Sequence, residues 1–155
     1  MSAQARILIA DDHYVVRQGV RSILTARPEW EVCGEAANGE EAVEAAMAQR
    51  PDVIIMDVTM PGISGLEASR RISGMELGVA VLVLTMHEFA ALSKDRRHVG
   101  AKGYVQKARA GRDLIDAIEA VLHGDTFFEP PAKPEPSADG SPESGRAYRM
   151  SLRYA

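Results

Sequence analysis

The chain has 155 residues, of which 46% are hydrophobic and 26% charged, as is ordinary for one soluble globular domain with its own core. Its net charge of −4 gives no reason to expect nucleic-acid binding through bulk electrostatics. Cys33 is the single cysteine, so an internal disulfide is excluded, and no secretory leader or membrane-spanning apolar run is visible. These features predict a cytoplasmic protein without membrane association.

Strand-like and helix-like segments alternate along the first 128 residues. Five short apolar runs predict strands, and five stretches with helical periodicity or high alanine content predict helices. In chain order these are strand 6–10, helix 13–27, strand 31–36, helix 40–50, strand 52–57, helix 66–73, strand 79–84, helix 88–99, strand 102–106 and helix 111–123. Five successive βα units favour an α/β fold with a doubly wound parallel sheet.

The composition changes after Glu129. Residues 130–145 contain five of the eight prolines and no large apolar side chain. Such a segment cannot bury enough apolar surface to offset the entropy cost of ordering it. Residues 129–155 are therefore predicted to be a disordered Pro-rich tail, and residues 1–128 to form the folded domain.

Polar side chains stand at the ends of four of the predicted strands. Asp11 and Asp12 follow the first strand, Asp57 ends the third, Thr85 follows the fourth and Lys107 follows the fifth. The carboxyl ends of parallel strands meet at one edge of the sheet, where open α/β folds place their sites. We expect these five side chains to converge there.

Three carboxylates, a hydroxyl and an ammonium suit a divalent metal site built around a phosphate-accepting aspartate. Mg²⁺ prefers oxygen ligands and commonly binds through one or two carboxylates plus phosphate oxygens. Asp12 and Asp57 are predicted to bind it directly, Asp11 through water, and Thr59 through its carbonyl oxygen. Asp57 would attack the phosphorus as a carboxylate nucleophile, while Lys107 pairs with a phosphoryl oxygen.

Each of these residues also has an ordinary interpretation. An Asp-Asp pair after a strand is usually a turn or a helix cap, and a lysine after a strand is normally solvated. Thr85 alone is only a strand residue. All of them together at successive strand ends, in this order, favour the site.

The motifs that contain these residues resemble receiver domains of two-component response regulators, and most closely the LuxR-type branch. The motifs are Asp11-Asp12-His13, the segment from Asp57 to Glu67, Val83-Leu84-Thr85-Met86 and the segment from Ala101 to Lys107. The likeness covers residue 5 to about residue 128. It implies a flavodoxin-like sheet of strand order 2-1-3-4-5 and phosphorylation of Asp57 by a sensor histidine kinase or phosphotransfer protein. It also implies that Thr85 is the switch hydroxyl and Tyr104 the switch aromatic, although Tyr104 also suits core packing.

Three features depart from the LuxR-type pattern. Such regulators usually continue into a helix-turn-helix DNA-binding domain, and the Pro-rich tail is too short and too polar to form one. The predicted helix 88–99 carries five polar or charged residues, 94–98, in a row. The residues before the last helix lack a Ser or Asp cap. All three concern the output surface and not the phosphorylation chemistry.

Four hypotheses remain. The favoured one is a phosphoacceptor switch, not an enzyme, that acts on an unknown partner or a second copy through the fourth helix, fifth strand and last helix. The alternative is a DNA-binding transcriptional response regulator whose effector domain is absent from this chain. A flavodoxin-like cofactor binder is disfavoured, because Asp11 and Asp12 would repel a phosphate group. A receiver that never accepts phosphate is disfavoured because every expected acidic residue is present.

Overall fold

The computed structural model describes residues 5–86 and 100–128. The sequence order of elements is β1 (Ala5–Ala10), α1 (Tyr14–Leu24), β2 (Trp30–Ala36), α2 (Gly39–Gln49), β3 (Val53–Asp57), α3 (Gly65–Gly74), β4 (Ala80–Thr85), β5 (Gly103–Gln106), a short 3₁₀ turn (Lys107–Arg109) and α5 (Ala110–Leu122). The predicted helix 88–99 and the predicted tail lie outside the described residues. No helix in the described part is long and apolar enough to cross a membrane.

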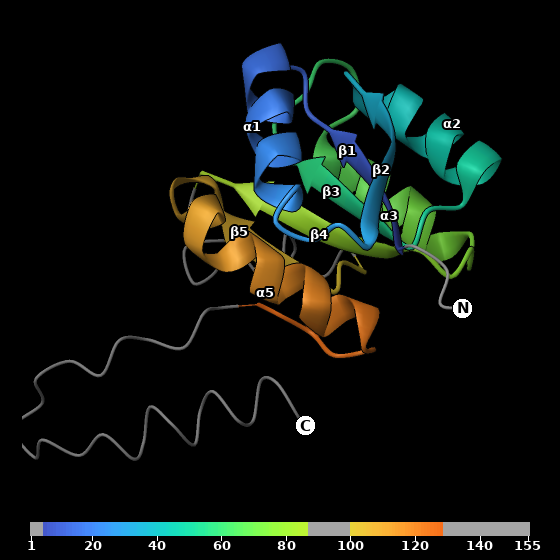
Figure 1. The fold of residues 1–155 in the computed structure, drawn as a ribbon. Helices are drawn as coiled ribbons and strands as arrows, with labels where there is room; N and C mark the ends of the chain where they lie inside the picture. Colours follow the sequence, from blue (N-terminus) through green and yellow to red (C-terminus); the bar gives the residue numbers. More distant parts are fainter. Residues whose placement is uncertain (1–4, 87–99, 129–155) are drawn as a thin grey trace, which may run out of the picture.

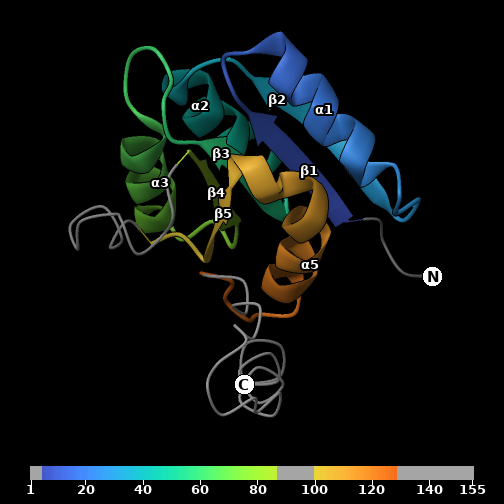
Figure 2. The same ribbon diagram turned by 90° about the vertical axis from the view of Figure 1, so that its left-hand side faces the viewer.

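The strands form one parallel sheet in the order β2-β1-β3-β4-β5, which confirms the predicted α/β architecture and strand order. Helices α1 and α5 cover one face of the sheet, and α2 and α3 cover the other (Figures 1 and 2). Because the strands are parallel, their arrowheads in Figure 1 point toward a common edge, the carboxyl edge of the sheet.

Strict alternation along the central strands builds two hydrophobic cores. Ile7, Ile9 and Ile55 pack with α1 and α5, whereas Leu8 and Met56 face α2 and α3. All five side chains are at most 1% exposed. Burial of one such side chain contributes about 1.5–3 kcal/mol, so the two cores supply the main stabilising term and leave the strand ends free for polar chemistry.

Side-chain caps define where two of the helices begin. Asn38 accepts a hydrogen bond from the Glu41 amide (2.8 Å) at the start of α2, and Ser64 accepts one from the Glu67 amide (3.1 Å) at the start of α3. α5 begins at Ala110 without a side-chain cap, as the sequence indicated, and the 3₁₀ turn precedes it. α1 ends at Leu24, three residues earlier than predicted, because a turn before Pro28 replaces the last predicted helical turn.

The segment after α5 returns to the sheet and covers the outer edge of β5. The Tyr104 amide donates to the Phe127 carbonyl (2.7 Å), and the Phe127 amide donates to the Lys102 carbonyl (3.0 Å). The chain passes so close to Gly103 that a Cβ there would lie 2.7 Å from the Phe127 carbonyl oxygen. The backbone of this edge strand is therefore hydrogen-bonded by the domain itself.

Candidate functional site

The register of the two central strands brings the aspartates together. Ala10 of β1 pairs with Met56 of β3, so the residues that follow them, Asp11 and Asp57, are neighbours at the carboxyl edge. Both are buried, at 1% and 2% exposure. Carboxylate oxygens of Asp11, Asp12 and Asp57 and a ring nitrogen of His13 all lie within 4.8 Å of one another. The sequence predicted the three aspartates but not His13.

Lys107 bridges the two buried carboxylates. Its Nζ lies 2.8 Å from Asp57 Oδ1 and 3.3 Å from Asp11 Oδ2. Burial lowers the pKa of Lys107, but the hydrogen bond and charge of Asp57, with the charge of Asp11, outweigh it and raise that pKa overall. The lysine is thus held as an ammonium ion, as the sequence interpretation requires.

Asp57 combines burial with strong neighbours. Burial raises the pKa of its carboxyl, and the negative charge of Asp11 adds to that effect. Hydrogen bonds from Lys107 and from the Thr59 amide oppose the rise without reversing it. Desolvation and repulsion therefore disfavour the Asp57 carboxylate, and any added positive charge would favour it.

Three buried oxygens of the aspartate cluster lack a hydrogen bond: Asp11 Oδ2, Asp12 Oδ1 and Asp57 Oδ2. Asp11 Oδ2 lies near the Lys107 ammonium but is not aligned to accept a hydrogen bond from it. Asp12 Oδ1 lies 3.1 Å from the His13 ring nitrogen and likewise lacks a hydrogen bond. Three carboxylates against one ammonium also leave an excess of negative charge. Unpaired carboxylate oxygens in such a cluster are the donor set that a hard divalent cation prefers, so these residues fit Mg²⁺.

His13 lies at the rim of the cluster. Its amide donates to Asp11 Oδ1 (2.8 Å), which orients that carboxylate while the chain turns into α1. Its ring is largely exposed, with Nδ1 3.3 Å from Asp11 Oδ1. Histidine after an Asp-Asp pair is not by itself a metal signal, which is why the sequence did not identify it.

The other predicted residues lie where the strands place them. Thr85 ends β4, is buried, and pairs with Gln106, the residue before Lys107. Thr59 follows β3, and its amide donates to the Asp57 carboxylate. Tyr104 is 1% exposed and belongs to the core between the sheet and α2–α3, with its ring 6.0 Å from that of Phe128. Its role in core packing is confirmed.

The loop after Asp57 is fixed by close backbone approach. A Cβ at Gly65 would lie 1.7 Å from the Asp57 carbonyl oxygen, so only glycine fits there. The Gly65 amide donates to the Val58 carbonyl (2.9 Å), and Glu40 of α2 accepts from the Ile63 amide (3.2 Å). The two ends of the loop that carries Thr59 are therefore bonded to each other, and its Ile63 amide is bonded to α2.

Sequence reasoning also missed a polar cluster behind the aspartates. Arg17 Nη1 donates to the Asp11 carbonyl oxygen (2.6 Å), and its Nε donates to Glu35 (2.6 Å). Glu35 also accepts from Arg21. The helical spacing of Arg17 and Arg21 placed them on one face of α1, but nothing in the sequence placed Glu35 beside them.

A family model described as the response regulator receiver domain matches residues 7–119. The chain belongs to this family. It is a receiver domain of the two-component type, a class of phosphorylation-activated signalling switches. The resemblance inferred from the strand-end motifs is thereby confirmed.

Known proteins place this receiver among LuxR-family regulators. It is 40% identical over 122 residues to the response regulator UvrY of Escherichia coli O6:H1, which covers 79% of this chain and 56% of UvrY. It is 38% identical over 125 residues to the transcriptional regulatory protein DegU of Brevibacillus brevis, covering 81% and 53%. A LuxR-family response regulator from Aurantimonas sp. SI85-9A1 superposes with a TM-score of 0.75 at 34% identity, covering 96% of this chain and 99% of that one. The chain spans about half the length of the curated relatives it matches.

Proposed function

We propose that Asp57 accepts a phosphoryl group from the phosphohistidine of a sensor kinase or phosphotransfer protein. The observation that carries this proposal is the environment of Asp57. One of its oxygens bonds Lys107 at 2.8 Å, and the other is buried at the carboxyl edge without a partner. A carboxylate that is desolvated, placed by an ammonium ion and still unsatisfied is suited to act as a nucleophile.

The acidic cluster would hold Mg²⁺. Asp57 and Asp12 would bind it directly and Asp11 through water, because their carboxylate oxygens lie close together and three of them lack a hydrogen bond. The carbonyl of Thr59, which follows β3, would add a ligand. When bound, the cation supplies positive charge that offsets the repulsion between a phosphodonor and the carboxylates. The site residues themselves do the rest of the chemistry.

In the transfer step an Asp57 oxygen forms a bond to phosphorus while the phosphorus–nitrogen bond of the donor breaks. The electron pair of that bond stays with the departing imidazole, which takes a proton from solvent. The product is an acyl phosphate on Asp57. Lys107, already within 2.8 Å of the carboxylate, would then pair with a phosphoryl oxygen at the same position.

The new phosphoryl group would act on the rest of the domain through Thr85 and Tyr104. Thr85 ends the neighbouring strand beside the Lys107 segment, so its hydroxyl would be drawn toward a phosphoryl oxygen. Tyr104 lies two residues from the edge of the same strand pair and would repack. These shifts would change the surface of β5 and α5, and with it the predicted helix 88–99, which lies outside the described residues, and so control binding to a partner protein or second copy. The domain would turn over no external substrate.

Phosphorylation is tested by incubating the chain with acetyl phosphate or phosphoramidate and Mg²⁺, followed by intact mass measurement. The wild type should gain one phosphoryl group, and Asp57→Ala and Asp57→Asn should gain none. Asp52→Asn is the matched control, because Asp52 flanks the other end of β3 and is exposed. A phosphoryl gain that persists in Asp57→Ala would contradict the assignment.

A second candidate function, regulation of transcription, is suggested by the name of the longer relative DegU. The net charge of −4 and the acidic edge give this chain no electrostatic basis for DNA binding. We expect no binding of the 155-residue chain to duplex DNA by fluorescence anisotropy at low salt, with or without acetyl phosphate. Specific binding would favour the transcriptional function instead.

A further inference from the structure

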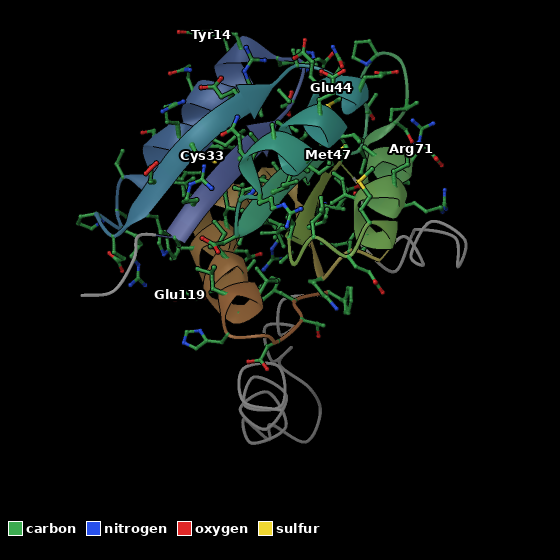
Figure 3. All side chains as sticks on the ribbon, turned by 90° about the vertical axis from the view of Figure 1, so that its right-hand side faces the viewer. Tyr14, Cys33, Glu44, Met47, Arg71 and Glu119 are labelled. Atoms are coloured by element: carbon green, nitrogen blue, oxygen red, sulfur yellow. The ribbon has the colours of Figure 1, made fainter. Side chains whose placement is uncertain are left out.

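The edge strand β2 contains one extra residue. Ile7 of β1 pairs with Val32, but the next residue, Leu8, pairs with Gly34, so Cys33 has no counterpart in β1. Cys33 packs against the core on the α2–α3 side, and Gly34 lies on the same side, where a Cβ would meet the Gln49 side chain at 3.0 Å. Figure 3 views the molecule from this edge strand, with Cys33 labelled. Two successive residues thus share one face, as in a β-bulge.

The bulge reverses the direction of Glu35. Side chains alternate along a regular strand, so if β2 continued without the bulge Glu35 would share the face of Cys33 and point toward α2. With it, Glu35 reaches α1 on the opposite face and accepts hydrogen bonds from Arg17 and Arg21. Bulges often re-aim one side chain next to a functional site, and Glu35 lies one residue before the carboxyl end of its strand.

The re-aimed Glu35 holds Arg17, and Arg17 holds Asp11. Arg17 is only 16% exposed, and its planar guanidinium donates simultaneously to Glu35 and to the Asp11 carbonyl oxygen, each at 2.6 Å. The next residue of β2, Ala36, accepts from the Asp11 amide (3.0 Å). The end of β2 therefore fixes both backbone groups of Asp11, one directly and one through Arg17.

We infer that Arg17 and Glu35 are positioning residues for divalent-cation binding at the acidic cluster, an inference that rests on the proposed function. We call these two residues and the Asp11 carbonyl the β2 clamp. The clamp sets where the Asp11 and Asp12 carboxylates stand before a cation arrives. Without it, the chain after β1 would have to be ordered at the moment of binding, which lowers affinity.

Charge must be separated from geometry in the test. Removing the positive charge of Arg17 would by itself strengthen attraction of a cation to the carboxylates, in opposition to the lost positioning. Arg17→Lys keeps the charge and removes the planar fork that bonds two acceptors at once. Arg21→Lys makes the same change on the same helix, at a residue that bonds Glu35 but has no hydrogen bond to Asp11 within the described contacts.

The experiment is a titration of each protein with magnesium chloride by isothermal calorimetry at constant ionic strength, with thermal unfolding measured without cation. We expect Arg17→Lys to weaken Mg²⁺ binding about tenfold, and Arg21→Lys less than twofold, at similar melting temperatures. Phosphorylation by phosphoramidate should need more Mg²⁺ in Arg17→Lys and recover to within about twofold of wild type at saturating Mg²⁺. Glu35→Asp, which keeps the charge but shortens the reach, serves as a second variant should Arg17→Lys fail to fold.

Equal losses of affinity in Arg17→Lys and Arg21→Lys, or no loss in either, would overturn the inference. The inference would also be overturned if the loss of Mg²⁺ affinity in Arg17→Lys and Arg21→Lys simply followed the loss of melting temperature in each variant. These outcomes differ from failure of the proposed function, in which the wild type itself would neither bind Mg²⁺ nor accept phosphate. If the wild type does both and Arg17→Lys binds Mg²⁺ equally well, only the inference about the β2 clamp would be wrong.

Discussion

The two ends of the parallel sheet contrast in how their polar groups are paired. At the amino end, the Arg6 amide donates to the Asp52 carboxylate (2.8 Å), and the Arg6 side chain donates to the Gln49 carbonyl. The Asp52 amide in turn donates to the Arg6 carbonyl (2.8 Å). At the carboxyl end, Lys107 forms ion pairs with two buried aspartates, and oxygens of the cluster still lack a hydrogen bond. All three buried side-chain oxygens without a hydrogen bond in the described residues lie there.

The contrast separates structural polarity from functional polarity. Both ends carry aspartates and cations, so residue type alone would not distinguish them. At the amino end, the polar groups of Arg6 and Asp52 are hydrogen-bonded within the chain, so an added ion would make no stabilising contact there. The carboxyl end retains buried carboxylate oxygens without hydrogen bonds, at a cost in stability that a bound cation would offset.

The largest effect is expected at the two glycines that begin and end α3. Gly65→Ala places a Cβ against the Asp57 carbonyl oxygen, at the carboxyl edge of the sheet. It should lower the free energy of unfolding by about 3 kcal/mol. Gly74→Ala, at the other end of the helix, meets nothing within 4 Å and should raise it by up to about 1 kcal/mol. Urea denaturation of both variants measures the difference. Equal effects would show that the close approach at Gly65 is not real.

Lys107→Ala should give the next largest loss, about 2 kcal/mol without cation. Removal of the ammonium leaves Asp11 and Asp57 buried without their counter-charge, and the partial exposure of Lys107 keeps the cost below that of a fully buried pair. Excess Mg²⁺ should recover part of the loss, because the cation binds the folded state only. Lys102→Ala, at an exposed lysine before β5, should change stability by less than about 0.5 kcal/mol. No recovery with Mg²⁺ would contradict a cation site.

Glu35 should make stability depend on acidic pH. Its hydrogen bonds with Arg21 and Arg17 hold the pKa of its carboxyl below the ordinary value of 4.5. A lowered folded-state pKa gives stability that is present above pH 4.5 and is lost as the pH falls through the folded value. Glu35→Gln should therefore lower the free energy of unfolding by about 1 kcal/mol at pH 7, and by almost nothing once the pH is below the folded-state pKa of Glu35.

The control for this pH effect is Glu44→Gln, at an exposed glutamate of α2 (Figure 3) that has no ion pair in the described residues. Its stability should follow that of the wild type at every pH. Denaturant unfolding across the acidic range would measure both variants. A Glu35→Gln curve that runs parallel to the wild type would show that the ion pairs contribute nothing.

The smallest effects should have opposite signs at the two ends. Asp12→Ala removes one charge from the unpaired cluster and should raise the free energy of unfolding without cation by about 0.5 kcal/mol. Asp52→Ala removes the acceptor of the Arg6 amide and should lower it by about 0.5–1 kcal/mol. Added Mg²⁺ should stabilise the wild type and Asp52→Ala but much less the Asp12→Ala variant. Loss of stability in both variants would contradict the contrast.

Much of this molecule was predictable because its signals are local and repeated. Runs of apolar residues ended by Asp11, Asp57 and Thr85 gave the strands and their common edge, and the structure brings Asp11 and Asp57 together beside Lys107. The parallel order followed from successive βα units. The role of Thr59 as a Mg²⁺ ligand and the roles of Thr85 and Tyr104 in switching stay predictions.

The missed features depend on register and on backbone approach. The extra residue at Cys33 leaves no mark in the composition of β2, yet it decides which face Glu35 occupies. The contact of Arg17 with the Asp11 carbonyl joins a helix to a backbone oxygen, which residue types cannot reveal. The end of α1 at Leu24 depended on a turn before Pro28, where sequence periodicity continues although the helix does not.

The return of the chain along β5 determines where the domain can be cut. Phe127 occupies the backbone hydrogen-bonding positions that an edge strand would otherwise offer to another molecule. A protein that stopped at Gly124 would keep every helix and strand of the sheet and yet present an open edge, which is a template for strand addition between copies. Solubility and the absence of intermolecular β-pairing in a shortened receiver should therefore depend on retaining residues 126–128, although none of them belongs to the phosphorylation chemistry.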